Sequence, residues 1–200
     1  MRTARSAVLA TVAVLAGLSA TVTGCSSGEA PAAPSGAPFG PACTALPAEG
    51  PGSLAALAAG PLASAVGASP LLTTLAAAVR DANLVDTFNS ADGVTLLAPS
   101  DVAFDAVPPA TLGPLLADVP ALTRLLEHHV LRGRLSPAQL AGQHTTLAGD
   151  RVIVTGSGRR FSVGADQTLA AAGPATVVCG GLQTANATVY VVDRVLQPAG

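Results

Sequence analysis

The hydrophobic pattern changes period part-way along the chain, and this change most limits which folds the sequence can form. Up to about residue 128, apolar residues recur at the spacing of a helix face, most clearly within residues 70–79 at Leu71, Leu72, Leu75 and Val79. From residue 151 onward the apolar runs are short, β-branched and separated by Gly or Asn, as in residues 151–155, 161–163, 176–179 and 188–192. Helices followed by strands predict an α+β fold.

Shorter segments fit the same division. Residues 53–57 and the Ala-rich stretch after them predict a helix that is interrupted at Gly60 and Pro61. Residues 94–97 predict a buried strand, after which Ser100 caps a short helical turn. Two further helices are predicted at residues 111–117 and 120–128, whereas residues 165–175 have the composition of a loop or an Ala-rich turn.

The predicted core lacks large aromatic side chains. Half of the residues are hydrophobic, but the chain has no Trp, one Tyr and four Phe. The core must therefore consist mainly of Ala, Val and Leu, which bury less apolar area per side chain than aromatic residues do. We expect a covalent cross-link to help stabilise such a core.

The N-terminus resembles an export signal with a lipidation site. Arg2 and Arg5 precede an apolar stretch at residues 7–20, which is shorter than the roughly 20 residues that a membrane helix needs. Val22, Thr23 and Gly24 then lead into Cys25, as in a bacterial lipobox, where the cysteine thiol receives a diacylglyceryl group. The alternative is an ordinary signal peptide cut near a cysteine. We predict a signal peptide at residues 1–24 and lipidation of Cys25.

The predicted mature chain consists of a linker and one domain. Residues 25–38 are rich in Ser, Gly, Pro and Ala without apolar periodicity, which predicts a flexible linker that reaches at most about 40 Å. Residues 39–200 contain no second linker and no repeat, so we predict a single domain there.

Cysteine usage predicts a disulfide. With Cys25 lipidated, Cys43 and Cys179 remain, and two thiols in an exported chain most simply pair. Closing so long a loop stabilises by up to about 5 kcal/mol in the chain-entropy description. The rival, a metal site, lacks a Cys-x-x-Cys motif or a histidine at ligand spacing.

Charge and motifs argue against nucleic acid and against catalysis. Removing residues 1–24 takes away two arginines and no acid, so the formal net charge falls from −2 to −4, which disfavours nucleic-acid binding. Within the predicted domain, residues 39–200, no Gly-x-Ser-x-Gly nucleophile elbow occurs, and His128, His129 and His144 lack metal-ligand spacing. The segment 156–158 fits a hairpin turn better than a phosphate loop. We expect no catalytic, metal or cofactor site, and no enzyme activity.

Three stretches, in order, resemble the fasciclin (FAS1) domain family. TLLAPSDVAF at residues 95–104 is similar to the first family motif, and VYVVDRVLQP at 189–198 is similar to the second. Between them, LLEHHV at 125–130 is similar to the short L-x-x-H-V segment of the family. More narrowly, FGPAC at 39–43, GPGSL at 50–54, PLLTTL at 70–75, VCGG at 178–181 and TANATVY at 184–190 resemble secreted and surface-lipoprotein antigens of mycobacteria. The resemblance implies one FAS1 domain with N-terminal helices packed on a β-rich wedge, and a Cys43–Cys179 disulfide.

The resemblance also has local consequences. Ser100 and Phe104 fall at structural positions of the first motif, and Asp193 in the second should need hydrogen-bond donors. The connection at residues 84–94 is short for the family, and residues 165–175 resemble an insertion. Asn186 begins a glycosylation sequon in form, but its context favours a turn.

Adhesive members of the family use a Tyr-His pair, and His128 and His129 occupy these two positions here. Leu122, Leu125 and Leu126 set a helical stripe that continues to His129, so we expect His129 rather than His128 on the apolar face. His128 replaces the motif tyrosine. This substitution weakens the expectation that the chain recognises partners in the way that adhesive family members do.

Two functions stay open on the sequence. The first is a membrane-tethered adhesion or interaction module outside the cytoplasm, lipid-anchored and partly secreted, with a cell-surface protein or glycan as partner. The second is a carrier of an apolar ligand, a lipid or glycolipid, at the cell envelope.

Overall fold

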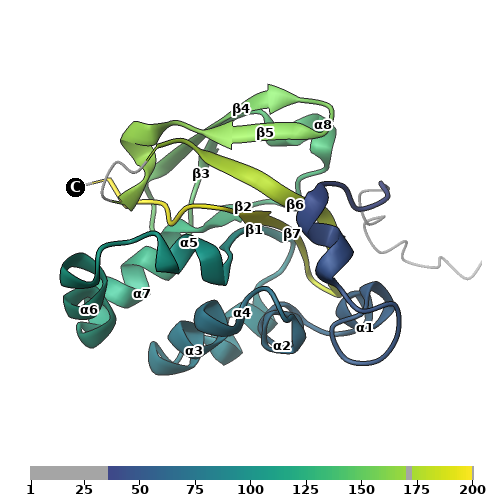
Figure 1. Ribbon diagram of the computed structural model, residues 1–200, viewed down its shortest axis with the longest axis horizontal. Helices are drawn as coiled ribbons and strands as arrows, with labels where there is room; N and C mark the ends of the chain where they lie inside the picture. Colours follow the sequence, from purple (N-terminus) through teal and green to yellow (C-terminus); the bar gives the residue numbers. More distant parts are fainter. Residues whose placement is uncertain (1–35, 170–172, 200) are drawn as a thin grey trace, which may run out of the picture. The chain divides into compact units, whose positions relative to one another are not determined.

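The computed structural model describes residues 36–169 and 173–199 (Figure 1). The predicted signal peptide, Cys25 and residues 26–35 of the predicted linker lie outside the described residues, as do residues 170–172 of the predicted insertion.

Helices dominate the first half of the described chain and strands dominate the second, as the α+β prediction requires. The helical elements are η1 (Pro41–Ala45), α1 (Leu54–Ala59), α2 (Leu62–Ala68), α3 (Thr73–Asp81), α4 (Val85–Ser90), α5 (Asp101–Asp105), α6 (Pro109–Ala117), α7 (Val119–His128), α8 (Pro137–Leu140) and η2 (Ala165–Gln167). The strands are β1 (Val94–Pro99), β2 (Val130–Arg132), β3 (Gly142–Thr145), β4 (Arg151–Ser157), β5 (Arg160–Val163), β6 (Ala175–Gln183) and β7 (Ala187–Val192).

The seven strands form one sheet that closes on itself. Their order is β2-β1-β7-β6-β5-β4-β3, and β1 and β7 are parallel whereas the other neighbours are antiparallel. A bridge between Leu131 of β2 and Thr146, the residue after β3, joins the two ends of this order. The sheet is therefore barrel-like. In Figure 1, α1 to α7 lie on one side of β1 and β7, and β3 to β5 lie on the other.

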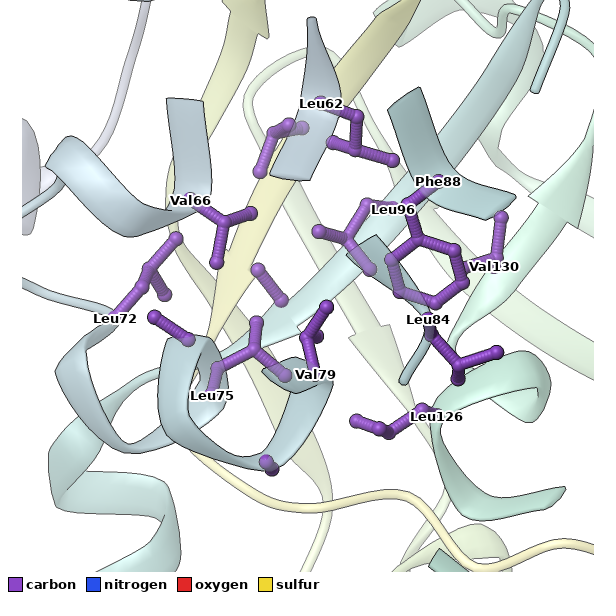
Figure 2. Packing of buried hydrophobic residues seen from close by; sticks show 14 of the residues in the cluster. Leu62, Val66, Leu72, Leu75, Val79, Leu84, Phe88, Leu96, Leu126 and Val130 are labelled. Atoms are coloured by element: carbon purple, nitrogen blue, oxygen red, sulfur yellow. The ribbon is translucent and has the colours of Figure 1, made fainter. Parts of the chain in front are cut away.

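β1 and β7 separate two hydrophobic cores. Leu96 of β1 and Val189 of β7 face the helices, whereas Leu97 and Tyr190, one residue further on, face the barrel interior. Figure 2 shows the helix side, where Phe88 of α4 lies beside Leu96 and Leu75 of α3 belongs to the same cluster. Because both faces of these strands are covered, every residue of β1 and β7 is buried, and neither strand alternates in polarity.

A covalent link and a backbone bridge join the N-terminal segment to β6. Cys43 and Cys179 form a disulfide across 136 residues, which confirms the predicted pairing. Phe39 exchanges two backbone hydrogen bonds with Gly180, at 3.0 and 2.7 Å. The Phe39 ring enters the barrel core, with its centroid 6.1 Å from that of Phe161. The cross-link thus supports an aromatic-poor core, as the composition suggests it should.

Several elements differ from the sequence predictions. Residues 84–94, predicted as a short connection, contain α4, because Phe88 is buried in the helix-side core. The segment 165–175 is not only a loop, since it contains η2, and Thr168 pairs with Leu196. β2, β3 and α8 were not predicted. All three are at most four residues long, too short to show a clear period.

Asn186 forms the turn that the sequence favours, and its side chain holds the helices to it. Its oxygen accepts from the Leu62 N–H at 2.8 Å, and its amide donates to the carbonyls of Phe88 and Ala91 at 2.9 and 2.7 Å. Thr188, the last residue of the sequon, is buried. These bonds give Asn186 a structural role between α2, α4 and the β6–β7 turn.

Candidate functional site

The candidate interaction residues His128 and His129 lie at the junction between α7 and β2. Asp118 caps the start of α7 by accepting from the Ala121 N–H, and Pro120 stands in the first turn, where no backbone donor is needed. His128 is the last residue of the helix and His129 is its C-cap. The chain then enters β2 directly, so this junction fixes where β2 begins.

His129 bridges the helix end and the C-terminal segment, and its side chain is 1% exposed. Nδ1–H donates to the Leu125 carbonyl at 2.8 Å, and Nε2 accepts from the Leu196 N–H at 2.9 Å. This pattern assigns the neutral imidazole with the proton on Nδ1. Burial lowers the pKa of His129 to about 4, which favours the same neutral form. The sequence placed His129 on the apolar face, and the structure confirms this.

His128 is also buried, which the helix period did not predict. Its side chain is 2% exposed, and Nδ1 lies 2.8 Å from both carboxylate oxygens of Asp150. The helix period does not include Asp150, which comes from the β3–β4 turn and supplies the buried ring with a partner. Nε2 of His128 has no hydrogen-bond partner among the described residues.

Asp150 connects the histidine pair to the end of the chain. It accepts hydrogen bonds from the Thr146 hydroxyl and, at 3.0 Å, from the Ala199 N–H. Burial tends to raise the pKa of Asp150, but these bonds and His128 outweigh it and hold the pKa below its ordinary value. Arg124 of α7 donates to the Ala199 carbonyl at 2.6 Å. His129, Asp150 and Arg124 therefore fasten residues 196–199 across the α7–β2 junction.

This geometry does not present His128 or His129 to a partner. Both rings are internal, so the interaction motif predicted at these positions offers no exposed side chain in this structure. The Thr146 hydroxyl donates to Asp150 and not to His128. The site therefore does not pair a hydroxyl nucleophile with a histidine base. The junction therefore has a structural role, because its bonds hold the C-terminal segment to the end of α7.

The other motif residues build the fold. Ser100 caps α5 by accepting from the Ala103 N–H, which confirms the predicted cap. Asp101 accepts from the Thr73 and Thr74 N–H groups and so caps α3. Asp193 has the donors that the sequence required, because Thr176 donates both its N–H and its hydroxyl at 2.6 Å. These residues connect helices to strands.

The described residues contain neither a metal-binding cluster nor a helix that could span a bilayer. Over residues 36–169 and 173–199, no group of three or more His, Cys, Asp or Glu side chains is placed to hold a metal ion. In the same part of the chain, no helix has both the length and the apolar character that a bilayer span requires. An apolar pocket between α1, α2 and β6, lined by Leu57, Val66 and Leu182, has a volume of about 10 Å³, roughly one water molecule.

The family model of the fasciclin domain matches residues 70–198, which include all three motif stretches. The chain belongs to the fasciclin domain family. In this chain, the first and second motif stretches contain most of β1 and β7, the two parallel strands of the sheet.

Relatives of this fasciclin chain cover most of its length. It is 39% identical to "Immunogenic protein MPB70" of Mycobacterium bovis over 202 aligned residues, which cover 97% of each chain. It is 41% identical to "Cell surface glycolipoprotein MPT83" of Mycobacterium tuberculosis over 154 residues, covering 74% of this chain and 66% of that protein.

A solved FAS1 domain pair from the insect cell adhesion molecule fasciclin I shares 25% identity, with a TM-score of 0.48. That match covers 63% of this chain and 45% of the solved chain.

Sequence reasoning missed Asp150, Arg124 and the partners that they hold. Asp150 follows Gly149 in an ordinary turn, and no spacing connects it to His128 across 22 residues. Only the closure of the sheet at Leu131 and Thr146 brings the turn to the helix end.

Proposed function

We propose that this protein is a fasciclin-domain interaction module displayed outside the cytoplasm and anchored to the membrane through a lipid on Cys25. The observation that carries the proposal is the 41% identity to proteins named cell surface glycolipoproteins. The Cys43–Cys179 disulfide agrees with an oxidising compartment, and the lipobox-like residues before Cys25 supply the anchor.

The partner in this proposal is a cell-surface protein or glycan. Because His128 and His129 are buried, recognition has to use other residues of the fasciclin domain. The fold supplies a rigid support for such a surface, since one cross-link and two cores hold the helices and strands together.

Anchoring is tested by replacing Cys25 with Ser in the full chain and comparing membrane and soluble fractions. We expect the variant in the soluble fraction, whereas a Ser26→Ala control stays with the membrane. Mass spectrometry of the N-terminal peptide should show the diacylglyceryl group on Cys25 only in the wild type and the control. Unchanged fractionation of Cys25→Ser would contradict anchoring.

Interaction is tested by displaying the anchored protein on cells and cross-linking it to neighbouring proteins, together with binding to a glycan array. A specific protein or glycan that folded protein captures, and that reduced and unfolded protein does not, supports the proposal. Absence of any such partner contradicts it.

The carrier function is the alternative outcome. It requires the apolar pocket beside Leu57 and Leu182 to widen well beyond 10 Å³ to accept an acyl chain. Native mass spectrometry of protein from its own membrane would then show a co-purifying lipid that remains after removal of the anchor. A ligand-free spectrum supports the interaction module.

A further inference from the structure

The β4–β5 hairpin and the N-terminal segment enclose an open hollow of about 460 Å³. Arg159 of the turn and Arg160, the first residue of β5, line it together with Gly40 and Pro41. This volume lies within the range of small-molecule sites in proteins. The hollow shares no residue with the α7–β2 junction.

Hydroxyl groups cross the base of the hollow in one row. Thr155 of β4 pairs with Ser162 of β5, which pairs in turn with Thr176 of β6. Val154 and Val163, their neighbours along the strands, face the barrel core, so the three hydroxyl residues face outward. The Thr155 hydroxyl lies 3.1 Å from the Ser162 hydroxyl, and both belong to the lining.

The two arginines of the hollow are not engaged by the protein. Both are exposed, and within the described residues neither guanidinium has a hydrogen bond or an ion pair. Arg124 and Arg134 differ, since each donates to backbone carbonyls. Adjacent free guanidinium groups in a chain of net negative charge indicate a site for an anion.

The nearby carboxylate of Asp193 does not occupy these arginines. It bonds to the lining residue Thr176, which satisfies one carboxylate oxygen with its N–H and the other with its hydroxyl. Ser162 and Thr155 therefore remain as the hydroxyls nearest in the row to Arg160, which lies two residues before Ser162 on the same face of β5.

Backbone geometry fixes the shape of the hairpin. Gly156 has φ +116°, and a Cβ there would collide with the Arg160 carbonyl, so only glycine allows this close approach. Gly158 has φ +64° and begins the two-residue turn that carries Arg159. The two guanidinium groups thus leave a defined turn and not a long loop.

We propose that this hollow binds a phosphate group, with Arg159 and Arg160 neutralising its charge and the Thr155 and Ser162 hydroxyls forming hydrogen bonds to it. Guanidinium forks match phosphate oxygens in geometry, and hydroxyl groups satisfy the oxygens that remain. Two sources supply this chemistry, namely a phospholipid headgroup and a soluble phosphate ester. Gly40 lies two residues after the predicted linker, so under the proposed anchoring, on which this source rests, headgroups are close to the hollow.

The phosphate arm of the test uses full-length chain carrying Cys25→Ser, exported by the host and purified. Inorganic phosphate is titrated at low ionic strength while backbone NMR signals are followed. We expect saturable shifts at Gly156, Arg160 and Ser162, and at least tenfold weaker binding in the Arg159→Ala/Arg160→Ala double variant. Arg80→Ala/Arg132→Ala, which removes two exposed arginines elsewhere, is the matched control and should bind as the wild type does. Equal binding by both double variants overturns the proposal.

The vesicle arm identifies the source with the same three proteins. Phosphatidylcholine vesicles with and without phosphatidylglycerol are floated on a density gradient. Loss of two arginines at an anionic surface should lower partitioning about 30-fold, and added salt should weaken binding by the wild type. Phosphate binding without flotation assigns a soluble phosphate ester, and both together assign the headgroup. Because none of these proteins carries the lipid, the result is independent of whether Cys25 anchors the native chain.

Discussion

Polar groups serve opposite purposes in the α7–β2 junction and in the β4–β5 hollow. At the junction, His128, His129 and Asp150 are directed inward and bonded to one another or to the backbone. At the hollow, Arg159 and Arg160 extend outward from a tight turn without protein partners among the described residues. The family resemblance drew attention to the first region. The geometry points to the second as the one that is free to bind.

The largest effect should follow removal of the His129 side chain. His129→Ala leaves the Leu125 carbonyl and the Leu196 N–H unpaired inside the protein and opens a cavity. We expect a loss of about 3 to 5 kcal/mol in the free energy of unfolding, measured by urea denaturation. His144→Ala is the control, because the half-buried His144 ring bonds, among the described residues, to the Leu140 carbonyl alone, and it should cost about 1 kcal/mol. Equal losses of unfolding free energy in the two variants would show that the buried bonds of His129 contribute no more than the single bond of His144.

The junction should also make stability depend on pH. The pKa of His129 is about 4 in the folded chain against an ordinary value of 6.5, so the unfolded chain takes up the proton first as pH falls. Stability should therefore be full above pH 6.5 and decrease down to about pH 4, by on the order of 3 kcal/mol. Urea denaturation across this window measures the slope. His129→Gln should flatten it, and an unchanged slope in that variant would assign the effect to other groups.

A smaller effect is expected at Asp150. Asp150→Asn keeps the shape but weakens the contact with His128, which should cost about 1 to 3 kcal/mol. Hydrogen exchange at the Ala199 amide should become faster, because that N–H donates to the Asp150 carboxylate. Asp166→Asn, at an exposed position, is the matched control. A slow Ala199 amide in Asp150→Asn would show that Arg124 alone holds the end of the chain.

The smallest effect on stability should come from the hollow. Arg159→Ala/Arg160→Ala removes exposed groups without protein partners, so the free energy of unfolding should stay within about 0.5 kcal/mol of the wild type. Thermal unfolding followed by circular dichroism checks this. A larger loss would mean that the arginines stabilise the hairpin. The polar groups of the hollow would then be structural, like those of the α7–β2 junction.

The sequence predicted the parts of the fold whose signal is local. The stripe from Leu71 to Val79 gave α3, and the apolar runs at residues 94–97 and 188–192 gave the two strands buried on both faces. Cysteine counting gave the disulfide without any geometry. Ser100 and Asp193 also behaved as their residue types require, one as a cap and one with two donors.

The remaining parts depend on contacts between distant segments. α4 has six residues and one buried side chain, Phe88, so its order comes from packing and from Asn186, nearly 100 residues further on. β2 and β3 exist because the sheet closes, and the same closure brings Asp150 to His128. The hollow needs the register of β4, β5 and β6 together with the N-terminal segment, and no single stretch of sequence encodes that combination.

The Cys43–Cys179 disulfide has a mechanical consequence for a chain that is pulled from its N-terminus. Tension reaching Phe39 passes first to the bridge with Gly180 and then through the sulfur atoms into β6. The cysteines are 136 positions apart, and the chain between them, with all the α-helices and β1 to β5, does not carry this tension. What resists the pull is the ladder between β6 and β7, so strand separation there has to come before the helices and β1 to β5 take up the load.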